Sequence, residues 1–156
     1  MEIVARFHAT MARNRGDRVQ PRNGERHTVL VIEDDAALLK LLGEILNTAG
    51  FEVRFARNRE ELKVELNRKP RPDIALLDLS LPDMDGFEVL EKMRGHPTLA
   101  ELPVIIMTGR SQAHHMTRGL ALGADGYVTK PFDEQDLLDA IRTTAPERDS
   151  SVSSYG

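Results

Sequence analysis

The chain has 156 residues, a length that favours one domain with a single sizeable core. It contains no cysteine, which excludes disulfides, thiol nucleophiles and thiolate metal sites but leaves oxygen ligands for a hard cation. The net charge of -4 and the 29% of charged residues are typical of a soluble globular protein. We find neither an apolar run of membrane-spanning length nor a signal-peptide core, so we expect a cytoplasmic location without membrane insertion.

The charge is unevenly distributed along the chain. Residues 1–26 contain six arginines and three acids, a local balance of +3 that leaves -7 for the remainder. Such a segment could contact nucleic acid or an acidic partner, but we interpret it as a basic, disordered N-terminal tail. Residues 146–156 are rich in serine and are predicted to be a flexible tail or linker. The folded domain is therefore expected to span residues 27–145.

The first predicted strand is the apolar, β-branched run at residues 28–32. It ends in three consecutive acids, Glu33, Asp34 and Asp35. Leucine and isoleucine then recur at helical spacing until Gly50, which predicts a helix. The carboxylates therefore lie in the connection between a strand and a helix.

A second strand is predicted where residues 51–55 alternate apolar and polar, as an edge strand with one wet face does. Asn58 is expected to cap a short helix, which Pro70 and Pro72 bring to an end. The apolar run at residues 74–77 follows. Because this run is short and continuous, it is typical of a strand buried on both faces.

Asp78 comes directly after this third strand, and a loop with Pro82 and Gly86 leads into the next helix. An aspartate in this position could simply cap the turn after the strand. In open α/β sheets, however, ligands bind beyond the carboxyl ends of the strands. Asp78 is therefore a candidate for chemistry as well as for capping.

Two further strands are predicted in the second half of the chain. Residues 104–107 form another continuous apolar run, which ends in Thr108. A weaker helical pattern covers residues 111–122. The short strand at residues 127–130 ends at Pro131, and a last helix follows it.

Five predicted strands alternate with five predicted helices, which indicates an α/β fold with a mostly parallel sheet covered on both faces. Right-handed crossovers make this a single doubly wound, flavodoxin-like sheet with strand order 2-1-3-4-5. The continuous apolar runs suit the central strands. The alternating segment at 51–55 and the short one at 127–130 suit the edges.

This topology brings the polar side chains at the strand ends to one edge of the sheet; they are Glu33, Asp34, Asp78, Thr108 and Lys130. Three carboxylates close together repel one another unless a cation is bound, and all-oxygen ligation suits Mg²⁺ or Mn²⁺ rather than Zn²⁺. A carboxylate nucleophile beside a metal, a lysine and a hydroxyl predicts phosphoryl transfer onto Asp78.

The chain resembles, over about residues 27–145, the receiver domain of two-component response regulators, a chemotaxis-regulator-like phosphoacceptor domain. The matching segments are VIEDD at 31–35, DLSLPDMDG at 78–86, IMTG at 106–109 and GYVTKPF at 126–132. The resemblance implies that Asp78 accepts a phosphoryl group from a phosphohistidine. The donor would be a sensor histidine kinase or a histidine phosphotransfer protein.

The same resemblance implies a set of metal ligands. Asp34 and Asp78 would bind Mg²⁺ or Mn²⁺ directly, Glu33 would act through water, and the backbone carbonyl of Ser80 would be a further ligand. Glu33 is a variant of the more usual aspartate, and its longer side chain is expected to preserve metal binding.

The resemblance also assigns roles at the other strand ends. Lys130 would pair with the acyl phosphate, and the peptide before Pro131 would be cis. Thr108 and Tyr127 would be switch residues that alter the face made by the fourth helix, fifth strand and fifth helix. Without the resemblance, Tyr127 would be interpreted as an edge-strand aromatic with its hydroxyl in water.

We therefore predict a phosphoacceptor response regulator of a two-component phosphorelay, which switches a protein-binding surface on phosphorylation. It would not be an enzyme for external substrates, since it would catalyse only its own phosphoryl transfer and autodephosphorylation. We expect a stand-alone receiver that acts on an unknown downstream protein, with no DNA-binding domain in this chain. Homodimerisation through the switch face is left open.

Two alternatives remain. The chain could be a receiver-like interaction module that works without phosphate, although it retains the acids, the hydroxyl and the lysine. It could also be a phosphatase with an aspartate nucleophile, but such enzymes place a second aspartate two residues later as the acid/base, and here that residue is Ser80.

Overall fold

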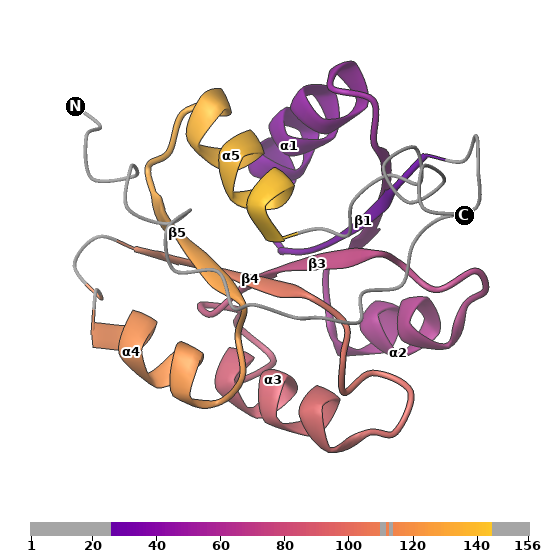
Figure 1. The fold of residues 1–156 in the computed structure, drawn as a ribbon, viewed down its shortest axis with the longest axis vertical. Coiled ribbons are helices and arrows are strands. Elements are labelled where there is room, and N and C mark those ends of the chain that lie inside the picture. Colours follow the sequence, from indigo (N-terminus) through magenta and orange to yellow (C-terminus); the bar gives the residue numbers. More distant parts are fainter. Residues whose placement is uncertain (1–25, 110–111, 113, 145–156) are drawn as a thin grey trace, which may run out of the picture.

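The computed structural model describes residues 26–109, 112 and 114–144. The predicted tail at 146–156 and all but the last residue of the predicted tail at 1–26 lie outside this part of the chain, so both stay predictions. Within the described residues, strands and helices alternate as predicted (Figure 1). In chain order they are β1 (Thr28–Ile32), α1 (Ala36–Thr48), β2 (Glu52–Ala56), α2 (Arg59–Asn67), β3 (Ile74–Asp78), α3 (Gly86–Gly95), β4 (Val104–Gly109), α4 (His114–Ala121), β5 (Gly126–Lys130) and α5 (Glu134–Thr144).

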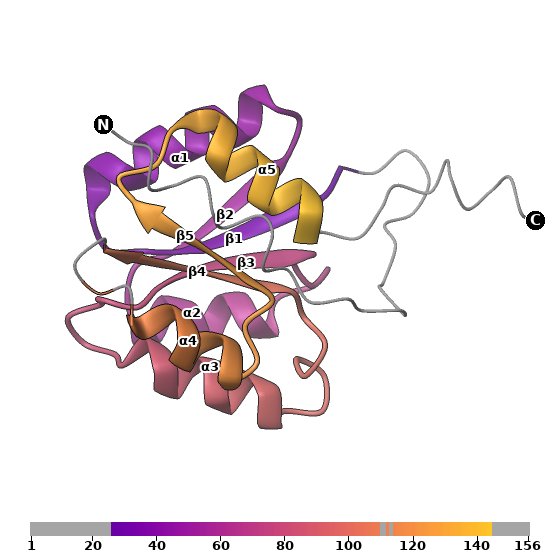
Figure 2. The same cartoon turned by 60° about the vertical axis from the view of Figure 1, so that its left-hand side comes forward.

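The five strands form one parallel sheet in the order β2-β1-β3-β4-β5, which confirms the predicted doubly wound topology. Figure 2 shows three layers, with α1 and α5 on one face of the sheet and α2, α3 and α4 on the other. The register places Asp78 beside Met107 and Lys130 beside Gly109. The carboxyl ends of the strands therefore meet at one edge.

The continuous apolar strands divide their side chains between two cores. In β1, Val29 and Val31 face α1 and α5, whereas Leu30 and Ile32 face the opposite layer. All four side chains are fully buried. This period of two within an apolar run is what a central parallel strand requires, since both of its faces are covered.

The edge strand β2 is less well covered than the alternation of residues 51–55 suggests. Phe51 is 8% exposed and Val53 is half-buried, but Phe55 is 38% exposed although it belongs to the same alternating set. The ring of Phe55 lies against α1 at Gly43, where a Cβ would approach its Cζ to 3.1 Å. An apolar ring therefore remains partly open to solvent at this edge of the sheet.

None of the helices within the described residues combines the length and the apolar composition needed to cross a bilayer.

Candidate functional site

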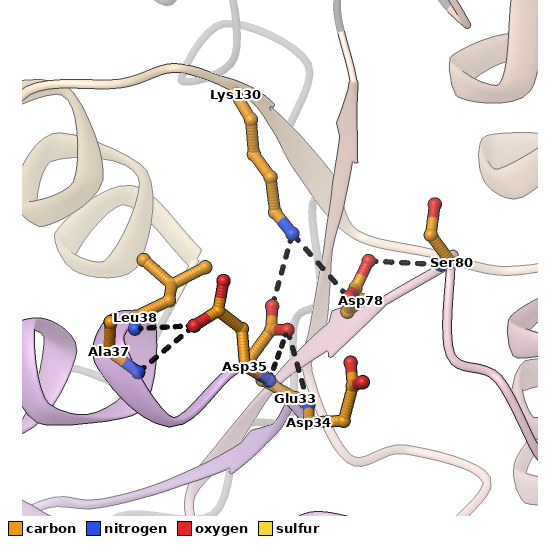
Figure 3. A network of polar contacts seen from close by, with 8 residues as sticks. All are labelled: Glu33, Asp34, Asp35, Ala37, Leu38, Asp78, Ser80 and Lys130. Carbon is orange, nitrogen blue, oxygen red and sulfur yellow. Dashed lines mark hydrogen bonds and ion pairs between the residues drawn. The ribbon is translucent and has the colours of Figure 1, made fainter.

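The first part of the candidate site is the turn between β1 and α1, where Glu33 is 1% exposed (Figure 3). Its Oε2 accepts hydrogen bonds from the backbone N–H groups of Asp34 and Asp35, each at 3.1 Å. Asp35 in turn caps α1, because its Oδ1 accepts from the N–H groups of Ala37 at 2.9 Å and Leu38 at 3.2 Å. The turn is thus fixed by its own carboxylates, and Asp34 is left exposed at its tip.

Asp78 is the last residue of β3 and is 2% exposed. Its Oδ1 accepts a hydrogen bond from the backbone N–H of Ser80 at 2.9 Å. The loop then returns closely to the strand end, since a Cβ at Gly86 would lie 2.8 Å from the Cα of Leu79. Glycine is needed there to let α3 begin beside Asp78, and Asp85 caps that helix by accepting from the N–H of Phe87 at 3.0 Å.

Lys130, at the end of β5, joins the two buried carboxylates. Its Nζ lies 3.1 Å from Oε1 of Glu33 and 3.4 Å from Oδ2 of Asp78 (Figure 3). Burial would lower the pKa of Lys130, but the charges of Asp78 and Glu33 and the hydrogen bonds to them outweigh burial and raise it. The peptide that links Lys130 to Pro131 is cis, as the family resemblance implied.

The pKa of Glu33 is raised above its ordinary value. Burial is the main cause, and the negative charge of Asp78 adds to it, while hydrogen bonds from the backbone of Asp35 and from Lys130 act in the opposite direction. The native site therefore favours the neutral form of Glu33 more than water does.

The acids Glu33, Asp34 and Asp78 form a cluster that fits a hard divalent cation. Each offers a carboxylate oxygen, and these three oxygens all lie within 4.8 Å of one another. Such oxygen ligands suit Mg²⁺ or Mn²⁺, and the exposed Asp34 leaves room for retained waters. The predicted role of the Ser80 carbonyl stays a prediction, although the N–H of the same residue binds Asp78.

The two predicted switch residues flank this cluster on β4 and β5. Thr108 is fully buried, and its hydroxyl donates to the carbonyl of Gln112 at 3.5 Å rather than to the acids. Tyr127 is half-buried beside Ile106 and packs at the border of the core under α2, α3 and α4. Burial raises the pKa of the Tyr127 hydroxyl, and the role of this residue as a switch stays a prediction.

One contact near the site had no signal in the sequence. The backbone N–H of Arg59, at the start of α2, donates to Oδ2 of Asp83 at 3.2 Å, and the Arg59 guanidinium donates to the Asp83 carbonyl at 3.2 Å. Asp83 belongs to the loop after Asp78. These residues are 24 positions apart, so neither periodicity nor local spacing could have paired them.

Comparison with known proteins agrees with this geometry. Residues 29–142 match the family model of the response regulator receiver domain. The phosphate regulon transcriptional regulatory protein PhoB of Rhizobium meliloti is 37% identical over 114 residues, which is 73% of this chain and 50% of that protein. The DNA-binding dual master transcriptional regulator RpaA of Synechocystis is 37% identical over 117 residues, 73% of this chain and 47% of that protein.

Solved structures show the same fold. The chemotaxis protein CheY4 of Vibrio cholerae superposes with a TM-score of 0.71 at 27% identity, covering 77% of this chain and 99% of that one. A CheY-like response regulator receiver domain protein of Methanospirillum hungatei gives a TM-score of 0.68 at 32% identity, covering 76% and 92%.

These matches correct one prediction. The chain spans about half the length of the curated relatives it matches, and those relatives are transcriptional regulators, one of them named as DNA-binding. The prediction of a stand-alone receiver without a DNA-binding domain is therefore wrong. The prediction rested on the shortness of the segment after the last helix. Because the match covers only about half of each relative, the length of that segment carries no information about an output domain.

Proposed function

The chain belongs to the response regulator receiver family, and from this premise we propose that Asp78 is the phosphoacceptor of a two-component phosphorelay. Receivers of this family are regulatory phosphoacceptors rather than enzymes for external substrates. The observation that carries the proposal is the position of the Asp78 carboxylate. It lies at a strand end, 3.4 Å from the ammonium group of Lys130 and within 4.8 Å of two further acids.

In the proposed reaction, a carboxylate oxygen of Asp78 attacks the phosphorus of a phosphohistidine on a sensor histidine kinase or phosphotransfer protein. The new P–O bond forms as the P–N bond breaks, and the imidazole leaves as a neutral group after taking up a proton. The N–H of Ser80 contacts Oδ1 of Asp78 and the ammonium of Lys130 contacts Oδ2, and together they fix the orientation of the carboxylate.

We assign the metal site to Asp34 and Asp78 as direct ligands, Glu33 through water and the Ser80 carbonyl. A bound Mg²⁺ or Mn²⁺ would supply charge neutralisation for the phosphoryl oxygens. Lys130 would supply the second positive charge, because its ammonium already lies beside Asp78. The acyl phosphate would be lost again by hydrolysis at the same site, which makes the signal reversible.

The switch would start at Thr108. Its hydroxyl would exchange the 3.5 Å hydrogen bond to the Gln112 carbonyl for one to a phosphoryl oxygen. That exchange would release the carbonyl of Gln112 and alter the environment of the half-buried Tyr127. The face made by α4, β5 and α5 would then differ between the two states.

The test is phosphorylation of the Asp78→Asn variant by a phosphohistidine donor or by acetyl phosphate in Mg²⁺. We expect labelling to be abolished, because an amide cannot form the acyl phosphate. The matched control is Asp83→Asn, which removes an exposed acid from the same loop and should label as the wild type does. Undiminished labelling of the Asp78→Asn protein would contradict the assignment.

A further inference from the structure

A contact of aromatic and cationic side chains joins α3 to α4, and the candidate site makes no use of it. The ring of Phe87, 6% exposed in the first turn of α3, lies against two side chains of α4. Its centroid is 5.2 Å from that of the His115 ring, with the ring planes at 87°, and 4.1 Å from Cζ of Arg118. His115 and Arg118 are three residues apart and therefore share one face of α4. We call these three side chains the α3–α4 contact.

The second half of α4 is held in another way. Gly119 is buried, and a Cβ at this position would collide with the side chain of Ile106 on β4. Leu120 packs against the core under α2, α3 and α4. The α3–α4 contact acts nearer the amino end of the helix, through its second and fifth residues. The first turn of α4 can therefore open while the second half stays packed on the sheet.

The surroundings of His115 favour the neutral imidazole. The side chain is half-buried, and its Nδ1 is buried without a hydrogen-bond partner among the described residues. Protonation makes both ring nitrogens donors, so it would leave a buried N–H without an acceptor. His115 is also the second residue of α4, where the helix dipole disfavours a positive charge.

Most of the charged neighbours of His115 act in the same direction. His114, whose ring centroid lies 4.3 Å from that of His115, and the guanidinium of Arg118 belong to the same helix. The carboxylate of Asp85, the residue that caps α3, opposes them. Burial is the largest effect, and with His114 and Arg118 it outweighs Asp85 and lowers the pKa of His115 below its ordinary value.

We propose that the α3–α4 contact is pH-sensitive: it holds the first turn of α4 on α3 while His115 is neutral and releases this turn when the ring is protonated. By linkage, its stabilisation is fully present above the unfolded-state pKa of histidine and is lost as the pH falls through the lower native value. Because α4 belongs to the proposed switch face, acidification would alter that face. The contact itself does not depend on the chemistry of Asp78, so its test uses the unphosphorylated chain in EDTA.

The first measurement is an NMR titration of the His115 ring signals in the full chain, from about pH 7.5 to about pH 4. We expect a lower midpoint in the native chain than in the same chain unfolded in urea. Equal midpoints, or a higher one in the native chain, would overturn the proposal, because protonation would then not oppose the contact.

The second measurement is hydrogen–deuterium exchange at pH values above and below the native midpoint. The amides of residues 118–121 report on the first turn, because in an α-helix they bond to the carbonyls of residues 114–117. We expect their protection factors to fall at least about tenfold on protonation, while those of β1 and β3 are retained. Unchanged protection in α4 would overturn the proposal, and so would an equal loss in the strands, which would report global unfolding.

Three variants identify the group that titrates. His115→Phe keeps an aromatic ring without a titrating group and should retain the protection of α4 at both pH values. His114→Gln removes a neighbouring charge, so it should raise the pKa of His115 and move the loss of protection to higher pH. The control is His96→Gln, an exposed histidine at the end of α3, which should behave as the wild type does.

The His114→Gln variant keeps the proposal testable if His115→Phe does not fold, since it alters only an exposed side chain. A midpoint that does not move in His114→Gln would overturn the proposal. Loss of protection that persists in a folded His115→Phe chain would do the same, because another group would then control the first turn of α4.

Discussion

Glu33 and Asp78 are carboxylates with 1% and 2% of their surface exposed, and both depend on the ammonium group of Lys130. Two buried negative charges near one another disfavour the folded state unless positive charge compensates them. The raised pKa of Lys130 shows that the native state favours its charged form. By linkage, this stabilisation is fully present below the unfolded-state pKa of lysine and is lost as the pH rises through the higher native value.

We therefore expect Lys130→Met to destabilise the metal-free protein by about 1–3 kcal/mol, because it leaves both carboxylates without their cation. Mg²⁺ should then stabilise the variant more than it stabilises the wild type, since the ion replaces the lost charge. Urea unfolding in EDTA and in Mg²⁺ measures both effects. Lys92→Met removes an exposed lysine from α3 and serves as the control; equal stability of Lys130→Met and wild type in EDTA would contradict the argument.

The sequence was sufficient to predict the charged members of the site but not the contacts that orient them. Glu33, Asp78 and Lys130 could be placed together because parallel strands end at one edge, whatever their loops do. The hydrogen bonds of Ser80 to Asp78 and of Thr108 to Gln112 depend on loop conformation. Loops have no hydrophobic periodicity, so neither partner could be derived from spacing.

At the scale of secondary-structure elements, one ion pair lies at the amino ends of the strands, on the side opposite the candidate site. It holds α3 against the start of β4 and β5. The guanidinium of Arg94 donates to Asp125 at 2.9 Å and to the carbonyl of Gly123 at 2.9 Å. The same Asp125 oxygen accepts from the backbone N–H of Val104 at 2.8 Å, and the residue is fully buried. This network fixes the elements that precede the switch face.

Asp125→Ala should accordingly cost about 3–5 kcal/mol of unfolding free energy, because it leaves a half-buried guanidinium and a buried N–H without this acceptor. Denaturant unfolding checks the value. The comparison is Glu61→Ala, which breaks the exposed pair with Arg57 and should cost much less, because solvent screens that pair. Similar losses in the two variants would show that the buried network is not a structural anchor.

For the molecule as a whole, the fold was predictable because its strands and helices differ so clearly in pattern. The runs at β1, β3 and β4 are continuous and fully covered, and the order of five strands followed from right-handed crossovers. The edge was less predictable. Phe55 looks like a core residue by alternation, yet its exposure depends on how α1 and α2 diverge around β2, which is a property of tertiary packing.

The acid cluster also links the stability of the whole domain to metal binding. An ion that binds only the native state adds RT ln(1 + [Mg²⁺]/Kd), or about 2.7 kcal/mol at a hundredfold excess over Kd. Asp34→Asn removes one of three carboxylates whose oxygens lie within 4.8 Å of one another, so it relieves repulsion and weakens the metal site.

We expect the Asp34→Asn protein to unfold at a higher temperature than the wild type in EDTA, and to gain much less from added Mg²⁺. Thermal unfolding over a Mg²⁺ series tests both parts at once, because repulsion and ion binding act on the same carboxylates. The control is Glu91→Gln on α3, which removes one negative charge from an exposed acid, as Asp34→Asn does. This variant should reproduce the wild-type Mg²⁺ dependence. Parallel Mg²⁺ curves for wild type and Asp34→Asn would mean that the ion binds elsewhere, whereas convergence of the two at high Mg²⁺ would identify the acid cluster as the site through which the cation stabilises the domain.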